Sequence, residues 1–280
     1  MMRAYRQAIR FDRCSMVAQG GRTWHKGMAK AEQRMKVTVL GSGDAFGSGG
    51  RYSTCLHVAA SDGTVMLLDC GATAMLALQR AGIDRNTVSA ILLTHFHADH
   101  VGGLPFFLLD ALFESRRKAP LTIAGPRGVE DWIARVTDTA FPGFGTNSFP
   151  FPIHYVEVTP EAVAEVAGHQ VTAFPMDHDQ RAGPCQGYRL ARDGRVFAYS
   201  GDTRWTETLV PLAAGADALL IECYTYDKPL KNHLDWMSLA ARLPDLTARR
   251  IVLTHMGPQM LANQDKATLE CAFDGMVIEV

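Results

Sequence analysis

Three histidines and one aspartate fall within the segment Thr94–Gly103, which reads THFHADHVGG. Imidazole and carboxylate groups are the ligands that zinc and similar divalent ions prefer. The segment directly follows the apolar run Ala90–Leu93, so these polar groups would lack partners behind a buried strand unless something gathered them. A His-rich surface loop is the alternative interpretation. We favour a metal site, with four candidate ligands: His95, His97, Asp99 and His100.

Further candidate ligands follow predicted strands, where a rigid scaffold can aim them. His178 follows the strand predicted at Val171–Phe174, and Asp202 follows the one at Val196–Tyr199. His255 follows the apolar run Ile251–Thr254, while His233 lies downstream of Glu222. Alone, each has a structural explanation, such as a capped turn or a satisfied histidine. Because the cluster at Thr94–Gly103 needs further metal-binding partners, we interpret these residues as candidate ligands.

The β-rich pattern begins at Met35 and occupies two halves of the chain, each with helices at intervals. This arrangement predicts two sheets packed face to face with helices outside. Other strands are predicted at Lys36–Leu40, Ser53–Val58, Val65–Asp69, Leu121–Ala124, Tyr188–Leu190 and Ala218–Cys223. Helices are predicted at Thr73–Arg80, Gly103–Glu114, Val129–Thr137, Thr206–Ala213, Trp236–Arg242 and Asn263–Phe273.

Three segments have open roles. The glycine-rich loop 41–51 (GSGDAFGSGGR) lacks the dinucleotide-binding order of glycines, and we interpret it as a wall of the active-site cleft. The helix at Gly103–Glu114 is apolar on nearly every side, which fits a buried helix or a pocket wall or dimer face. The aromatic loop Phe141–Pro152 fits a packed loop slightly better than a substrate grip.

Composition places the chain among ordinary globular proteins, with 280 residues, 47% hydrophobic and 20% charged. Six scattered cysteines without a CxxC pair predict a reducing compartment, and hence a cytoplasmic location. No apolar run approaches the roughly 18–20 residues of a membrane span. Residues 1–34 carry eight basic and two acidic residues, against 20 and 27 in the remainder. The body therefore lacks the basic excess that nucleic-acid binding normally needs.

Residues 1–34 show no strand alternation and only a weak helical pattern. We predict a disordered N-terminal extension there, which could be a targeting leader or a start-site artefact. Residues 35–280 are predicted to form one folded domain.

The ordered motifs HFHADH, DHD, SGDT and LTH, with LLDCG at Leu67–Gly71, resemble the metallo-β-lactamase superfamily, specifically the ribonuclease Z branch. The resemblance covers Met35–Val280 and implies an α/β fold, an αββα sandwich of two mixed sheets with a dinuclear metal site at one edge. It implies two divalent ions, with zinc expected and manganese or iron as alternatives. The implied ligands are His95, His97 and His178 for one ion, Asp99, His100 and His255 for the other, and Asp202 as the bridge, with Asp69 supporting the metal loop from outside.

Two positions in the motifs narrow the implied chemistry. Diiron oxygen-reducing relatives carry glutamate where this chain has His97, so the histidine favours hydrolysis. Hydrolytic β-lactamases usually carry cysteine where it has Asp202, and a bridging carboxylate is instead typical of phosphodiesterases, glyoxalase II and lactonases. A bridging hydroxide would attack a phosphodiester or related ester. Glu222 and His233 resemble the catalytic Glu–His pair of the ribonuclease Z branch, although NHLDW departs from the usual GHST and a structural histidine remains the alternative. The implied catalytic residues are Asp99, His233 and Glu222.

Ribonuclease Z grips tRNA with a long arm between its third histidine motif and the bridging aspartate. Only 24 positions separate His178 from Asp202, and a predicted hairpin over Gln186–Tyr199 fills them. We therefore predict a small ester or phosphodiester substrate, no nucleic acid, no membrane and, by analogy, a homodimer. The alternatives are a lactonase or carboxylic-ester hydrolase, a tRNA 3′-processing endoribonuclease, which the missing arm disfavours, and a metal-holding protein without turnover.

Overall fold

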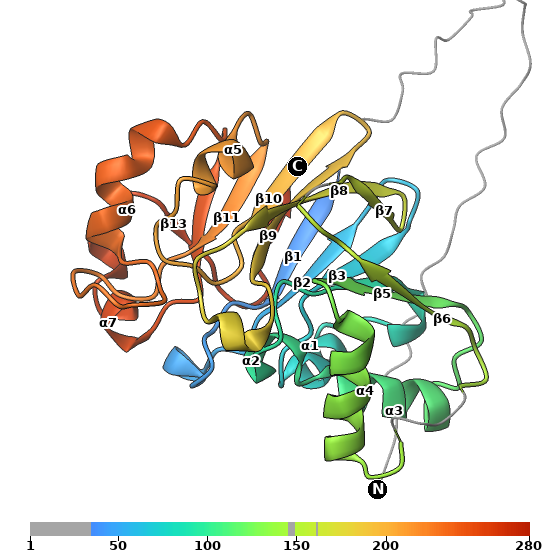
Figure 1. Ribbon diagram of the computed structural model, residues 1–280. Helices are drawn as coiled ribbons and strands as arrows, with labels where there is room; N and C mark the ends of the chain where they lie inside the picture. Colours follow the sequence, from blue (N-terminus) through green and yellow to red (C-terminus); the bar gives the residue numbers. More distant parts are fainter. Residues whose placement is uncertain (1–34, 145–148, 161) are drawn as a thin grey trace, which may run out of the picture. The chain divides into compact units, whose positions relative to one another are not determined.

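The computed structural model describes residues 35–144, 149–160 and 162–280. The predicted extension 1–34 lies outside the described residues, so it and the predicted domain division stay predictions. Within the described ranges, two seven-stranded mixed sheets form the centre of the fold (Figure 1). No helix in these ranges combines the length and the apolar character that crossing a bilayer requires.

The first sheet contains the N-terminal strands and the last strand of the chain, in the order β14-β1-β2-β3-β4-β5-β6. Strands β3 to β6 run parallel, whereas β14, β1, β2 and β3 pair antiparallel. The bounds are β1 Lys36–Gly41, β2 Cys55–Ala59, β3 Val65–Leu68, β4 Val88–Leu92, β5 Leu121–Gly125, β6 Ile153–Glu157 and β14 Val277–Glu279.

The second sheet has the order β13-β12-β11-β10-β9-β8-β7. Strands β7 to β10 pair antiparallel, and β10 to β13 run parallel. Because β8 and β10 both oppose β9, they point the same way. The bounds are β7 Ala164–Val166, β8 His169–Pro175, β9 Gln186–Arg192, β10 Arg195–Tyr199, β11 Ala218–Glu222, β12 Ile251–Thr254 and β13 Glu270–Cys271.

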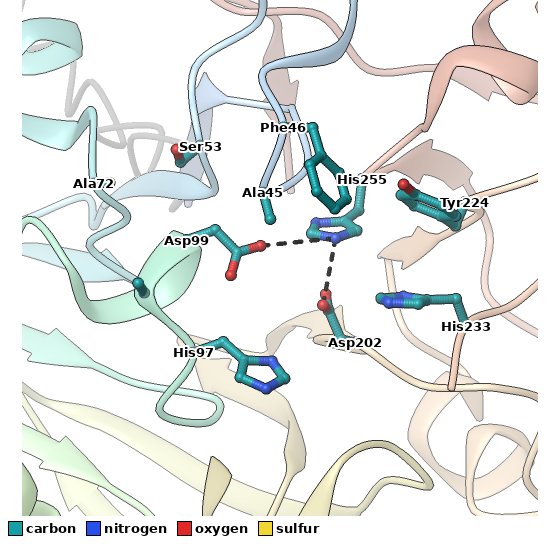
Figure 2. A pocket seen from close by; sticks show the side chains of 11 residues that line it. Ala45, Phe46, Ser53, Ala72, His97, Asp99, Asp202, Tyr224, His233 and His255 are labelled. Atoms are coloured by element: carbon teal, nitrogen blue, oxygen red, sulfur yellow. Dashed lines mark ion pairs between the residues drawn. The ribbon is translucent and has the colours of Figure 1, made fainter. Parts of the chain in front are cut away.

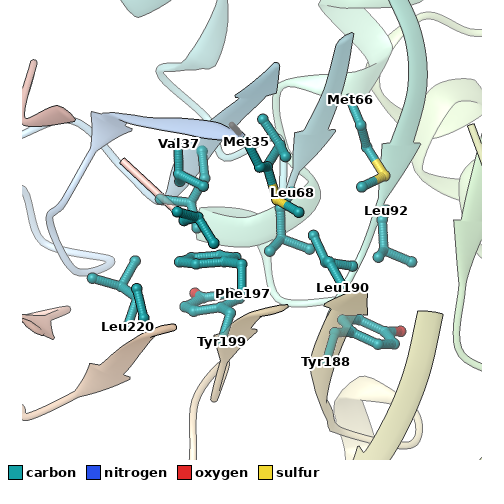
Figure 3. Packing of buried hydrophobic residues seen from close by; sticks show 14 of the residues in the cluster. Met35, Val37, Met66, Leu68, Leu92, Tyr188, Leu190, Phe197, Tyr199 and Leu220 are labelled. Carbon is teal, nitrogen blue, oxygen red and sulfur yellow. The ribbon is translucent and has the colours of Figure 1, made fainter. Parts of the chain in front are cut away.

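The main core lies between the two sheets, as Figure 3 shows for residues of β3, β9 and β10. Strand β3 shows why the core strands are continuous apolar runs in the sequence. Alternate side chains point to opposite faces, so Met66 and Leu68 face the other sheet while Val65 and Leu67 pack under helices. A strand buried on both faces needs apolar residues at every position.

Helices cover the outer face of each sheet, which confirms the predicted αββα sandwich. Helices α1 (Ala74–Arg80), α3 (Leu104–Phe113) and α4 (Val129–Ala140) pack on the first sheet. Helices α5 (Leu209–Ala213), α6 (Trp236–Arg242) and α7 (Pro258–Leu261) pack on the second. The short α2 (Ala98–Val101) follows β4, and 3₁₀ turns lie at Ser48–Gly50, Arg85–Thr87, Gln180–Ala182, Leu243–Asp245 and Gln264–Lys266.

Helix α6 has the predicted bounds because the Asp235 carboxylate accepts the backbone N–H of Ser238 at 2.9 Å and caps its first turn. The helix predicted at Asn263–Phe273 is wrong. Only the 3₁₀ turn Gln264–Lys266 forms there, and Ala267 is already extended. The following residues pair as β13 with the open edge of β12, so a non-local partner overrides the local helical pattern.

Helix α3 is buried on one face and exposed on the other, so it is not the fully buried helix of the first alternative, and its role as a dimer face stays a prediction. Leu104, Phe107 and Leu108 are buried against the first sheet, while Phe106 and Phe113 are exposed on the opposite face. In the aromatic loop, Phe144 and Phe151 are buried in the same cluster, as a packed loop requires. Residues 145–148 of that loop lie outside the described ranges.

Candidate metal centre

The candidate ligands meet because several strands end at the same edge of the sandwich. His95 follows β4, His178 follows β8, and Asp202 follows β10. His255 follows β12 directly, and Asp99 and His100 lie on α2. Parallel strands carry their carboxyl ends to one edge, so residues far apart in sequence become neighbours. The structure brings all seven predicted ligands together there.

His95, His97 and His178 form the first set of converging side chains. The Nδ1 atom of His97 lies 3.1 Å from Nε2 of His95 and 3.2 Å from Nε2 of His178. His95 and His178 are buried, whereas the side chain of His97 is 37% exposed. Three imidazole nitrogens facing a common point are suited to hold a metal ion.

Asp99, His100, Asp202 and His255 form the second set. The Nε2 atom of His100 lies 3.3 Å from an oxygen of Asp202 and 3.5 Å from one of Asp99. The Nε2 atom of His255 lies 3.3 Å from Asp202 and 3.9 Å from Asp99. This mixed nitrogen and oxygen set also suits a divalent ion.

Asp202 lies between the two sets. Its Oδ2 atom is 3.3 Å from His255 of the second set and 3.8 Å from His178 of the first. It is also 4.0 Å from Nε2 of His95. One buried carboxylate therefore faces ring nitrogens of both sets, the position that a bridging ligand requires.

The outer ring nitrogens of the histidines have their own partners. Nδ1 of His178 donates to the backbone carbonyl of Asn232 at 2.7 Å, and Nδ1 of His100 lies 2.8 Å from Asp69. The hydroxyl of Thr94 lies 3.1 Å from Nδ1 of His95. A hydrogen bond at Nδ1 leaves the lone pair on Nε2 and fixes the orientation of the ring. Sequence reasoning missed Thr94 and Asn232, because neither residue type signals a role in holding a histidine.

Asp69 holds the loop that carries the first ligands. Its buried carboxylate accepts the backbone N–H of Thr94 at 2.8 Å as well as contacting His100. Asp69 and His255 both adopt left-handed backbone conformations, with φ of 60° and 55°. Such strain is tolerated where the surrounding structure holds it, and it clusters at functional sites.

Two observations show that the residues fit a bound cation. Nε2 of His100 and Oδ1 of Asp202 are buried and face each other at 3.3 Å, yet neither makes a hydrogen bond of acceptable geometry to a described residue, although buried polar atoms normally have one. Burial opposes a charge on His100, but the carboxylates of Asp202, Asp69 and Asp99 outweigh it and raise its pKa well above the usual value. The buried carboxylates therefore favour positive charge among them, which divalent ions would supply.

Glu222 and His233 lie beside the second set and contact each other. Nδ1 of His233 is 3.2 Å from a carboxylate oxygen of Glu222, and burial raises the pKa of Glu222. Burial lowers the pKa of His233, but Glu222 outweighs it and raises that pKa to about 9. Glu222 also accepts the backbone N–H of Thr203, the residue after Asp202. This hydrogen bond joins the Glu222–His233 pair to the turn that carries Asp202, the candidate bridging ligand.

A pocket of about 430 Å³ opens over these groups (Figure 2). Ala45 and Phe46 from the glycine-rich loop form one side, as the wall interpretation of that loop expects, and Tyr224 and His233 form another. The Tyr224 ring stacks on His233, with centroids 4.8 Å apart and planes at 29°. Sequence reasoning missed Phe46 and Tyr224 as lining residues. The glycines of this loop, among them Gly43 and Gly47, were the available signal, because they mark a loop that can approach a ligand closely.

Curated relatives of the chain carry the name ribonuclease Z. The protein from Mycobacterium marinum is 29% identical over 255 residues, which cover 82% of this chain and 89% of the relative. The protein from Lachnoclostridium phytofermentans is 30% identical over 277 residues, covering 81% of this chain and 88% of the relative. These matches confirm the resemblance that the motifs predicted.

The fold is shared with the metallo-β-lactamase fold protein YhfI from Bacillus subtilis. The two structures have a TM-score of 0.68 and 21% identity, covering 88% of this chain and 100% of the other. A family model described as "Anti-Pycsar protein Apyc1" matches residues 35–274. That range contains every candidate ligand together with Asp69, Glu222 and His233.

Proposed function

This chain is a metallo-β-lactamase-superfamily hydrolase that is related to ribonuclease Z and belongs to the anti-Pycsar protein Apyc1 family, and from that premise we propose that it is a two-metal phosphodiesterase acting on a small substrate. The observation that carries the proposal is the position of Asp202, whose carboxylate faces both sets of histidines. A carboxylate between two metal positions suits phosphoester hydrolysis, in which two ions stabilise the attacking and the leaving oxygen.

We assign His95, His97 and His178 to one ion, and Asp99, His100 and His255 to the other. Zinc is the proposed ion, because imidazole-rich sets of this kind suit it. When bound, the two ions would supply a nucleophile from water at neutral pH and Lewis-acid stabilisation of charge on the phosphoryl oxygens. Asp69 would keep the ring of His100 in the orientation that presents Nε2.

His233 is the proposed general acid. Its raised pKa of about 9 keeps the imidazole protonated at neutral pH, and Glu222 holds the ring at the pocket. A positioned imidazolium can stabilise developing charge or donate a proton to the leaving oxygen. The hydrogen bond from the backbone N–H of Thr203 to Glu222 would hold His233 in a fixed position relative to Asp202.

Two features support a small substrate. The pocket volume of about 430 Å³ lies in the usual range for small-molecule sites. The hairpin of β9 and β10 fills most of the chain between His178 and Asp202, where the resemblance would place an RNA-gripping arm. Ribonuclease Z relatives nevertheless leave the substrate class open, so it must be measured.

The test is a panel assayed side by side: bis(p-nitrophenyl) phosphate, a 3′,5′-cyclic nucleotide, an acyl lactone and a precursor tRNA. We expect turnover of the first two, together with close to two equivalents of zinc by elemental analysis. Turnover of the lactone alone would establish the carboxylic-ester alternative, and cleavage of the tRNA would overturn the small-substrate proposal. A folded protein that carries no metal would refute the site assignment.

Two accompanying proposals concern the setting of the enzyme. We propose a homodimer, which sedimentation analysis of the full chain would test. We also propose a cytoplasmic location, supported by the absence of a disulfide among the five cysteines of the described residues. Fractionation of the producing cell would check that location.

A further inference from the structure

Phe46 is the most exposed of the large hydrophobic side chains in the described residues, at 81%. It lies in the glycine-rich loop and lines the same pocket as Asp99 and Asp202. Figure 2 shows its ring on the side of the pocket next to His255. Single exposed apolar side chains are common on protein surfaces. An aromatic ring that lines a candidate active site differs from them, because a substrate bound in the pocket would contact it.

The backbone that carries Phe46 is held firmly. The carboxylate of Asp44 is buried, and it accepts the backbone N–H of Phe46 at 3.1 Å and that of Ser48 at 2.9 Å. It also accepts the Ser48 hydroxyl at 2.6 Å. A buried carboxylate satisfied by its own loop fixes the shape of that loop. The exposure of Phe46 is therefore part of a defined loop structure.

The base of the loop is anchored to the other end of the chain. Asp274 accepts the backbone N–H of Ser42 at 2.9 Å and that of Tyr52 at 2.8 Å. The Ser42 carbonyl in turn accepts the backbone N–H of His255, at 3.1 Å. The loop is thus joined to a candidate metal ligand, and Phe46 has a defined place relative to the reacting centre.

The pocket is lined by two chemically different kinds of side chain: the polar groups of the candidate metal site with His233, and the apolar side chains of Ala45, Phe46, Ala72 and Ala98. Ala45 and Phe46 lie next to His255 (Figure 2). A phosphodiester that placed its phosphate at the candidate metal site would bring one of its substituents within reach of Phe46, which lines the same pocket. A flat, aromatic substituent would match the face of the Phe46 ring.

We propose that Phe46 is a specificity-determining residue whose ring stacks on a planar aromatic group of the substrate, such as a heterocyclic base. The proposal rests on the phosphodiesterase function and adds the chemistry of the group next to the phosphate. Stacking of a base on an aromatic side chain tolerates different bases, because every base has a π face. Phe46 would therefore select for the presence of a base more than for its identity.

The experiment compares two substrates that differ only in that group: a 3′,5′-cyclic nucleoside monophosphate and the 1-O-methyl ribose 3′,5′-cyclic phosphate that lacks the base. We expect Phe46→Ala to raise KM for the cyclic nucleotide about 10-fold, in line with the loss of one base–aromatic stack. Its kcat should stay within about twofold, and both constants for the base-free substrate should be unchanged.

Three further variants identify the interaction. Phe46→Trp should keep the low KM, since it keeps a flat ring, whereas Phe46→Leu should behave like Phe46→Ala. Phe113→Ala, which removes a 63% exposed phenylalanine that does not line the pocket, should change neither substrate. If Phe46→Leu equals the wild type, stacking is refuted. Equal KM changes for both substrates would show that Phe46 only shapes the pocket, and would overturn the proposal.

The outcomes also separate this proposal from the function on which it rests. A wild-type enzyme that hydrolyses neither cyclic phosphate refutes both. A wild-type enzyme that hydrolyses both with the same KM retains the phosphodiesterase function and refutes the role of Phe46. If Phe46→Ala leaves all kinetic constants unchanged, the ring serves something other than this substrate, such as contact with a protein partner.

Discussion

The floor and the rim of the pocket are built in different ways. We call the buried candidate ligands His95, His100, Asp202 and His255 the floor. Asp202 and His255 line the pocket itself, and all four side chains come from strand ends or the short helix after β4. The rim (Phe46, Tyr224 and His233) is partly or largely exposed and comes from loops. The floor histidines His95 and His100 have partners at their outer nitrogens, whereas Phe46 is held by the hydrogen bond from its backbone N–H to Asp44.

This difference separates chemistry from selectivity. Ligands must be held within a few tenths of an ångström, which rigid strand ends and buried hydrogen bonds achieve. Substrate contacts can adapt, and loops change without disturbing the core. We therefore expect substitutions in the floor to remove metal and activity together, and substitutions in the rim to change kinetic constants while metal remains bound.

The largest effect is expected for the floor residue Asp202. Asp202→Asn removes the charge that faces both sets of histidines, so metal content should fall and hydrolysis should drop on the order of 10³-fold or more. Elemental analysis and turnover of bis(p-nitrophenyl) phosphate measure this. Asp193→Asn, at the turn between β9 and β10, is the matched control and should retain both. A fully active Asp202→Asn enzyme would refute the bridging role.

His233→Ala should lower turnover by about 10²–10⁴-fold, the usual contribution of a general acid. Metal content should stay at the wild-type value, because His233 belongs to the rim. His154→Ala, an exposed histidine on β6, is the matched control. Loss of metal in His233→Ala would break the distinction between floor and rim, and would make His233 a ligand.

The pH profile sharpens the role of His233. Glu222 raises the pKa of this histidine to about 9, so the protonated form is present at neutral pH and is lost as the pH rises through that value. Bound cations oppose a charged imidazole, so the alkaline limb of kcat/KM should lie at or below about pH 9. Glu222→Gln removes the carboxylate and should move this limb to lower pH. An unchanged limb would show that another group titrates.

The smallest effects come from two buried aspartates that support the two regions. Asp69 contacts the floor through His100 and Thr94, whereas Asp44 holds the loop of the rim. Asp69→Asn should weaken metal binding about 10–100-fold in a chelator competition. Asp44→Asn should leave metal binding unchanged and raise KM for a cyclic nucleotide several-fold. The reverse assignment of the two effects would contradict the comparison.

Much of the fold could be predicted from local patterns. Strands β3, β4, β11 and β12 are short apolar runs buried on both faces, and α6 has a capping aspartate. The final segment could not be predicted in this way, because β13 and β14 form by pairing with β12 and β1, which are distant in sequence. A two- or three-residue strand has no pattern of its own, and its partner decides it.

The sequence by itself determined which side chains can bind metal, since their types and their places after buried runs are local properties. Only the tertiary structure decided how they are aimed. The backbone carbonyl of Asn232 orients His178, and every residue has such a carbonyl, so no sequence pattern could single it out. The same holds for Phe46. Its glycines alone indicate that its loop forms a wall, and its exposure at the pocket that Asp202 also lines follows from hydrogen bonds made far along the chain.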